Sequence, residues 1–213
     1  MKKNVLIFCL LGFVIAASAK VNPKGYYNMR LIGVDVSDGT KGEFRTERTR
    51  YGIDFSTYLD DEIEISLTVH PTHVSFELMN KTDEAIRVIW GEAKLAGFDG
   101  EWHPIVHRGI TSRKKSNNQE PSVIVRKSTL TDFISPNDNF FYTALGNYTA
   151  VVNEFLIGGE KSDGKIIRCF IPIEINGEKR GYTFIFDSAF ERVRGVKTRS
   201  TDGYYTSYRE ILR

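Results

Sequence analysis

The chain has 213 residues, with 29 lysine and arginine residues against 27 acidic ones. Lys2 and Lys3 lie in the first nineteen residues, which hold no acidic residue, so the rest of the chain carries 27 charges of each sign. This balance argues against a nucleic-acid-binding protein and gives no electrostatic reason to bind an anionic membrane. The remaining length of about 190 residues can bury a full core without disulfides.

The first nineteen residues, MKKNVLIFCLLGFVIAASA, predict an export signal. A positive start precedes an apolar core too short to cross a bilayer, and Ala17-Ser18-Ala19 provides a small-x-small cleavage site. Cys9 lies in mid-core and lacks the small preceding residue of a lipoprotein site. We therefore expect an exported bacterial protein, in the periplasm or on the outer surface of the cell envelope, with no transmembrane segment after cleavage. An uncut membrane anchor is the alternative.

Apolar and polar residues then alternate with period two, which predicts β-strands. The segments EIEISLTV at 62–69 and HVSFELMN at 73–80 are the first clear pair. Apolar residues meet apolar residues at each step when the turn at 70–73 closes, as a correct register requires. The predicted pairs are Val69 with Val74, Leu67 with Phe76 and Ile65 with Leu78.

Asn176-Gly177 is the strongest hairpin signal, because both loop positions of a type I′ turn need positive φ. The predicted register pairs Ile175 with Glu178, Glu174 with Lys179, Ile173 with Arg180, Pro172 with Gly181, Ile171 with Tyr182 and Cys169 with Phe184. We expect an opposite-charge pair between Glu174 and Lys179. Pro172 has no N–H to donate, so the other side of its strand is expected to be an edge, unpaired or bulged.

Further strands are expected around the Asp99-Gly100 turn, in SVIV and STLTDFI, and in NMRLIGVDV and VVNEFLI. Helical periodicity is scarce, with one short helix expected over 201–212. This pattern predicts an all-β fold, namely an antiparallel immunoglobulin-like β-sandwich with a short additional N-terminal β region and a C-terminal tail. The inward parity of Cys169 predicts a buried small hydrophobe rather than a nucleophile.

The domain boundaries follow from the same pattern. After the signal at 1–19 we expect a single domain over 20–190, with an N-terminal extension at 20–58 and a core at 59–190. A basic C-terminal tail at 191–213 completes the chain.

A family resemblance rests on FELMNKTDEAIRVIWGEAKLAGFDGEWHPIVHRGI, followed by EPSVI, DFISPNDNFFY and IPIEINGEKRGYTFIF. The order of Asn-Lys-Thr, a Trp-ended strand, an Asp-Gly turn, Val-His-x-Gly, Pro-Ser-Val-Ile and an Asn-Gly hairpin resembles uncharacterised bacterial exported proteins, often lipoproteins. The resemblance covers 58–186. It implies an immunoglobulin-like sandwich and an envelope location, and it implies no activity. This chain lacks the lipobox cysteine of the lipoprotein members.

The four histidines form two close pairs, His70 with His73 and His103 with His107. A zinc site needs three or four converging ligands, and neither spacing matches the His-x-His of a sheet site. Pro104 opposes the helix that would suit the second pair. We expect histidines at strand ends, on the surface or half-buried, and no cofactor. A metal site using these four residues is the alternative.

Three other motifs have simple interpretations. GEKSDGKI at 159–166 nearly matches a phosphate-binding loop, but it has Ile166 in place of Ser or Thr and runs into a strand. Asn80 and Asn147 open glycosylation patterns, which we discount because the signal is bacterial in type. Paired carboxylates could serve glycoside hydrolysis or calcium binding, but a solvated strand face is favoured for the acidic run Asp60, Asp61, Glu62 and Glu64.

The chain has no G-x-S-x-G elbow and no H-E-x-x-H motif. The main hypothesis is a non-enzymatic exported cell-envelope protein that binds or assembles with another envelope protein. The predicted partner-binding residues are Pro172, Arg113, Lys114, Lys115, Arg199, Tyr204 and Tyr205. The alternatives are a metal-binding protein or metal-dependent hydrolase using the paired histidines, and a carbohydrate-binding module using exposed Tyr or Trp.

Overall fold

The structure is a computed structural model. It describes residues 25–48, 54–110, 119–143, 149–152, 155–156 and 159–192. The predicted export signal, the helix over 201–212, Asn147 and the predicted partner-binding residues Arg113, Lys114, Lys115, Arg199, Tyr204 and Tyr205 lie outside these ranges.

The regular secondary structure of the described residues is almost entirely β-strand. The strands are β1 (Gly25–Val36), β2 (Glu43–Arg48), β3 (Asp54–Leu59), β4 (Ile63–Val69), β5 (Val74–Asn80), β6 (Ile86–Val88), β7 (Lys94–Ala96), β8 (Trp102–His107), β9 (Ser122–Ile124), β10 (Thr129–Pro136), β11 (Phe140–Thr143), β12 (Thr149–Val152), β13 (Ile166–Ile175) and β14 (Glu178–Arg192). Three short 3-10 helices accompany them: η1 (Trp90–Glu92), η3 (Asn137–Asn139) and η4 (Gly159–Ser162).

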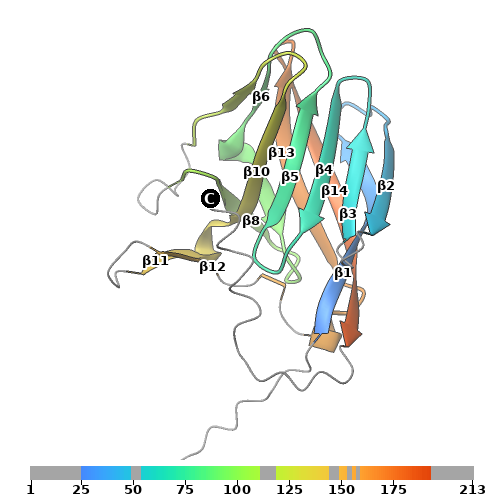
Figure 1. The fold of residues 1–213 in the computed structure, drawn as a ribbon, viewed down its shortest axis with the longest axis vertical. Coiled ribbons are helices and arrows are strands. Elements are labelled where there is room, and N and C mark those ends of the chain that lie inside the picture. The colour runs from blue at the N-terminus through green and yellow to red at the C-terminus, as the bar shows by residue number, and fades with distance from the viewer. Residues whose placement is uncertain are drawn as a thin grey trace, which may run out of the picture.

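Twelve of these strands form one antiparallel sheet that bends into two facing layers (Figure 1). The strand order is β1-β14-β13-β7-β8-β10-β5-β4-β3-β2, and β6 pairs with β13 and β9 beside this path. The two end strands come together where the Leu31 N–H donates to Thr46 Oγ1 at 3.1 Å. The all-β, antiparallel prediction is therefore confirmed, and the sheet is nearly a closed barrel. A separate hairpin of β11 and β12 projects from it (Figure 1).

The two predicted hairpins have the registers that the sequence indicates. Val69 faces Val74, Leu67 faces Phe76 and Ile65 faces Leu78 across β4 and β5. Across β13 and β14, all six predicted pairs occur, including Pro172 opposite Gly181. Asn176 and Gly177 have φ values of 53° and 80°, as a type I′ turn requires.

The core fills the space between the layers. Alternate residues of the long strands point inward. The largest fully buried side chains are aromatic: Trp90, Tyr58, Tyr182, Phe184 and Phe186. Cys169 is fully buried among them, and this burial raises the pKa of its thiol. Its interpretation as a small core hydrophobe is confirmed.

The expected N-terminal extension is an integral part of both layers. β1 pairs with β14 along its whole length, from Gly25 opposite Arg192 to Val36 opposite Tyr182. β2 and β3 continue the opposite layer beyond β4. The strand β14 also runs to Arg192, so the described structure extends slightly into the region that the sequence predicts as tail.

The expected edge at Pro172 does not exist. β6 pairs with β13 at Ile173 and Glu174, and β7 pairs with it from Arg168 to Phe170. The ladder is interrupted between these two strands, where η1 lies in the chain and the Ile89 N–H donates to the Pro172 carbonyl at 3.0 Å. Pro172 is in neither of these two ladders, which agrees with the unpaired position expected from its missing N–H. Pro172 itself is buried, and its assignment as a partner-binding residue stays a prediction.

The predicted ion pair between Glu174 and Lys179 does not form, because each side chain has another charged partner. Glu174 and Lys179 are opposite each other, but Lys179 bonds Glu92 at 2.8 Å and Glu174 lies 3.5 Å from Arg87. Both alternative partners come from the segment that carries η1, which the sequence did not place beside this hairpin. Nowhere in the described ranges does a helix have the length and apolar character needed to cross a membrane.

Candidate ligand-binding site

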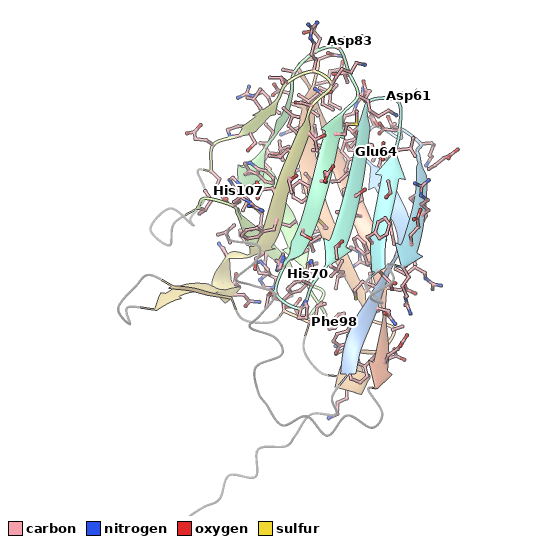
Figure 2. The ribbon with its side chains drawn as sticks, viewed as in Figure 1. Asp61, Glu64, His70, Asp83, Phe98 and His107 are labelled. Carbon is pink, nitrogen blue, oxygen red and sulfur yellow. The ribbon has the colours of Figure 1, made fainter. Side chains whose placement is uncertain are left out.

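The first histidine pair lies in the turn between β4 and β5 (Figure 2). The His70 and His73 rings stack with centroids 4.4 Å apart, and their partners are hydroxyl groups, Ser75 Oγ for His70 and Thr72 Oγ1 for His73, each at 3.0 Å. Burial lowers the pKa of His70, and burial with the neighbouring ring lowers that of His73 to about 3. Both imidazoles are therefore neutral at ordinary pH.

This turn also holds neighbouring segments in place. The Phe155 N–H donates to the Pro71 carbonyl at 2.9 Å, and Ser135 Oγ donates to the Thr72 carbonyl at 2.8 Å. The His73 ring packs edge-on against Phe133 of β10. The first pair is thus a structural stack that positions Phe155.

His107 has a different structural role, where β8 meets β10 (Figure 2). Its ring stacks on Trp90 at 4.3 Å, and its Nδ1 lies 3.1 Å from Asp132 Oδ2. The other oxygen of Asp132 accepts the backbone N–H groups of Arg108 and Phe133 at 2.9 and 2.7 Å. The buried carboxylate therefore fixes both the histidine and the end of β8.

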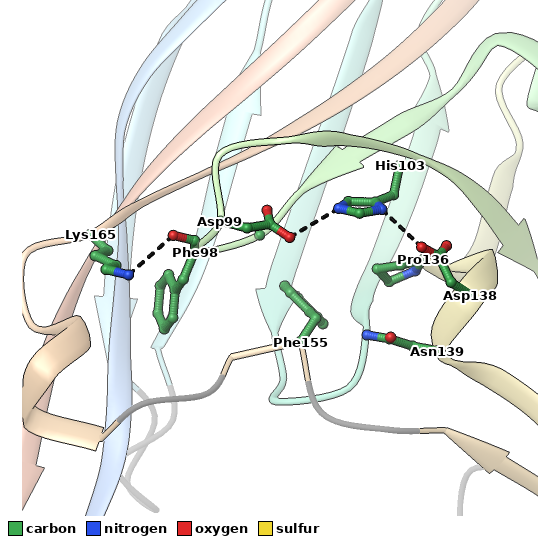
Figure 3. Close-up of a pocket in the computed structure, with 9 residues that line it drawn as sticks. Phe98, Asp99, His103, Pro136, Asp138, Asn139, Phe155 and Lys165 are labelled. Carbon is green, nitrogen blue, oxygen red and sulfur yellow. Dashed lines mark hydrogen bonds and ion pairs between the residues drawn. The ribbon is translucent and has the colours of Figure 1, made fainter.

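His103 lies elsewhere, on the rim of a cavity of about 310 Å³ (Figure 3). The cavity lies where the β7–β8 turn, η3 and the residues before β13 meet. Its apolar lining consists of Phe98, Pro136 and Phe155, and its polar lining consists of Asp99, His103, Asp138, Asn139 and Lys165.

The His103 ring lies between two carboxylates. Its Nε2 is 3.0 Å from Asp99 Oδ2, and its Nδ1 is 3.0 Å from Asp138 Oδ2. A neutral imidazole has one donor nitrogen and one acceptor nitrogen, so only the imidazolium can donate to both carboxylates. Partial burial acts to lower the pKa of His103, but the hydrogen bonds and charges of the two aspartates outweigh it and raise the pKa.

Local sequence explains how these groups come together. Gly100 has a φ of 79° and its N–H donates to the Gly97 carbonyl at 3.0 Å, which makes the tight turn before β8. Asp99 Oδ1 accepts the Glu101 N–H at 3.0 Å, so its other oxygen is directed to His103. A Cβ added to Gly97 would lie 3.4 Å from the Phe155 ring, and glycine therefore lets that ring approach.

Two further groups complete the rim. Lys165 Nζ donates to the Phe98 carbonyl at 3.2 Å, which places a positive charge on the rim. This lysine belongs to the segment that resembles a phosphate-binding loop, and that segment forms η4 and a turn before entering β13, as predicted. Asn139 comes from η3, next to Asp138.

The four histidines thus occupy three positions with separate partners. In the described ranges no group of three His, Cys, Asp or Glu side chains could hold a metal ion. At His103 the two carboxylates bind opposite ring nitrogens, so one ion could not contact the ring and both carboxylates.

Two polar residues singled out in the sequence are structural. Asn80 is fully buried, and its Nδ2 lies 2.7 to 3.2 Å from the carbonyls of Glu84, Ile124 and Val125, so it offers no room for a glycan. Asp60 is also buried, and its carboxylate accepts hydrogen bonds from Tyr58, Tyr182 and two backbone N–H groups. The expectation of a solvated acidic face is wrong for Asp60, although Asp61 is exposed.

The sequence identified His103 but missed its partners. Asp99 was interpreted only as a turn residue, although its position four residues before His103 across an Asp-Gly turn could have indicated the contact. Asp138 and Phe155 are distant in sequence, and no local pattern links them to His103.

Comparisons with family models, curated proteins and solved structures find no match to the chain. The resemblance expected from the sequence therefore rests on its motifs alone. The fold and the cavity define an all-β, antiparallel protein with a small, polar-rimmed pocket.

Proposed function

We propose that the chain is a non-enzymatic binding protein that holds a small ligand in the pocket beside His103. The observation that carries this proposal is the convergence of five polar side chains around an apolar floor. Ligand pockets commonly combine an apolar lining with a few convergent polar groups, and a volume of about 310 Å³ is at the small end of their range.

The geometry of His103 supports binding rather than catalysis. A general base needs a nitrogen lone pair directed at the substrate, and both ring nitrogens of His103 face carboxylates. Cys169 is buried in the core, away from any reactant. The polar groups of the pocket can therefore orient a ligand.

The same proposal includes an exported, bacterial, cell-envelope location and an immunoglobulin-like arrangement of the two layers. The predicted signal at 1–19 supports export, and the resemblance over 58–186 supports the envelope. Such sandwiches often carry binding sites on the loops at one end.

The proposal is tested by screening the purified chain against a mixed small-molecule library by ligand-observed NMR. Hits are repeated with Asp138→Asn, which keeps the side-chain shape but replaces an acceptor oxygen. The matched control is Asp61→Asn, an exposed aspartate outside the pocket. We expect at least one hit that Asp138→Asn weakens and Asp61→Asn leaves unchanged. Hits that respond equally to both variants would remove the pocket from consideration.

A second candidate function is assembly with another envelope protein, and a different strand supports it. Among the described strands, β9 pairs with β6 alone. Its Val123 is 61% exposed and the adjacent Val125 is 60% exposed. Exposed apolar residues on an open edge favour pairing with a strand of another protein.

This second function is tested by placing a photo-crosslinking residue at Val123, with Lys94 as an exposed control position on β7. We expect crosslinks to an envelope protein from position 123 and none from position 94. Equal labelling from both positions would contradict a partner at the β9 edge.

A further inference from the structure

We propose that the ligand of the His103 pocket is an uncharged carbohydrate, bound through one sugar ring. This inference depends on the proposed function, because it names the chemical class of ligand for the same site. It is carried by the charge balance, the apolar floor and the hydrogen-bonding groups of the pocket.

The charges of the pocket balance. Asp99 and Asp138 contribute two negative charges, and His103 must be an imidazolium to donate to both. Lys165 adds the second positive charge. A charged ligand would therefore find an equal repulsion for each attraction, unless it displaced an existing pair. An uncharged ligand meets no such cost.

The floor suits a ring with an apolar face. Phe98, Pro136 and Phe155 line one part of the cavity, while the polar groups lie on its rim (Figure 3). A pyranose presents a face of C–H groups, which carry partial positive charge. The face of an aromatic ring carries partial negative charge, so the two surfaces attract each other as they pack.

The rim matches the hydroxyl groups of a sugar. A carboxylate offers about four lone-pair sites, and Asp138 uses one of its oxygens for His103. The Asn139 side chain supplies both donors and an acceptor. A hydroxyl group can donate to a carboxylate and accept from an amide at once. A purely apolar ligand would leave these groups desolvated without partners.

The size of the cavity limits the ligand. A volume of about 310 Å³ is near the lower bound for ligand pockets. It accommodates one ring, either a monosaccharide or the end of a longer glycan that continues into solvent.

The experiment uses the purified chain and four neutral monosaccharides: glucose, galactose, mannose and N-acetylglucosamine. Saturation-transfer difference NMR detects binding, and titration gives the Kd. Phe155→Ala and Asp138→Asn are the pocket variants. Trp102→Ala is the control, because Trp102 is an exposed aromatic residue that packs on Phe170 outside the pocket.

We expect at least one sugar to bind, and each pocket variant to raise its Kd about tenfold, as loss of one hydrogen bond or stacking contact would. Trp102→Ala should leave the Kd unchanged. Phe155 is largely buried, so the Phe155→Ala variant can fail to fold. The Asp138 side chain is 57% exposed, and Asp138→Asn then provides the test.

Three results would overturn the inference. If Trp102→Ala abolishes sugar binding and the pocket variants do not, the sugar binds to the outer aromatic surface instead. If none of the four sugars binds but another compound binds and Asp138→Asn weakens it, the pocket is a ligand site whose ligand is not a carbohydrate. Silence from both the sugars and the wider library would remove the proposed function as well.

Discussion

The rings of His70 and His73 stack with centroids 4.4 Å apart in a buried turn, and each ring has a hydrogen bond with a hydroxyl group. Burial disfavours the charged form of both rings, and the neighbouring His70 adds to this effect at His73. The stability of the fold should therefore decrease in acid, because the unfolded chain binds protons at these histidines more readily than the folded chain does.

The first prediction concerns this sensitivity. The folded pKa of both histidines is lowered, to about 3 for His73, so their stabilising contribution is complete above the unfolded pKa of about 6.5 and is lost as pH falls toward the folded values. We expect the free energy of unfolding to fall by up to about 1.4 kcal/mol per pH unit for each histidine. Urea unfolding at pH 7 and pH 5 measures the change, and His73→Phe should reduce it. An equal decline in wild type and variant would contradict the assignment.

The second prediction concerns His103, whose shift has the opposite sign. Its folded pKa is raised, so its stabilising contribution is present below the unfolded pKa and is lost as pH rises through the folded pKa. Titration by NMR should place the His103 midpoint above that of a model histidine. Asp138→Asn should lower the midpoint by removing one acceptor charge, whereas Asp61→Asn should not. A midpoint that is the same in both variants would show that Asp138 does not act on the ring.

The third prediction concerns Asp60 in the core. The Tyr58 and Tyr182 hydroxyls donate to one of its oxygens at 3.1 and 3.2 Å, and burial is the main cause that raises the pKa of both phenols. Asp60→Ala leaves these donors and two backbone N–H groups without a partner, so we expect a loss of about 3 kcal/mol in unfolding free energy. Asp61→Ala, one residue away and exposed, should change it by less than about 0.5 kcal/mol. Similar effects from both variants would contradict the structural role.

The fourth prediction concerns two strand glycines. A Cβ at Gly181 would lie 2.5 Å from the Phe170 ring, whereas a Cβ at Gly33 would have its nearest neighbour at 3.8 Å. We expect Gly181→Ala to destabilise the protein by about 1–3 kcal/mol through overpacking. Gly33→Ala should be nearly neutral. Combining Gly181→Ala with Phe170→Leu should recover part of the loss, and thermal unfolding of all four chains measures it. No recovery would show that the ring is not the obstacle.

The fifth prediction concerns Asn80, which ties the end of β5 to β9 and to the loop before β6. Its amide donates to backbone carbonyls, and its Oδ1 accepts the Thr82 N–H at 2.9 Å. Asn80→Ala should cost about 2 kcal/mol, because buried carbonyls lose their donor. Asp83→Ala, at an exposed position in the same loop, is the control. A neutral Asn80→Ala would mean that water replaces the amide.

Local patterns predicted the hairpins, because alternation and the Asn-Gly turn act over a few residues. The sequence could not predict that β6 and β7 flank Pro172, since those contacts join segments about eighty residues apart. The pocket shows the same limit. His103 could be singled out because histidines are few in the chain. Asp138 lies beside it because η3 folds against β8, and Phe155 is held near it by a hydrogen bond to the Pro71 carbonyl.

The pairing of β1 with β14 has a kinetic consequence. The Asn28 amide donates to the Glu191 carboxylate across 163 positions of the chain, and the two strands are paired along the whole of β1. Among the described strands β1 is the first in the chain, and its ladder partner β14 is the last. Contacts of such long range slow folding, since the loop-closure entropy is lost before the contacts form. We therefore expect the local pairs β2–β3, β3–β4 and β4–β5 to form early in folding, and the pairing of β1 with β14 to form late.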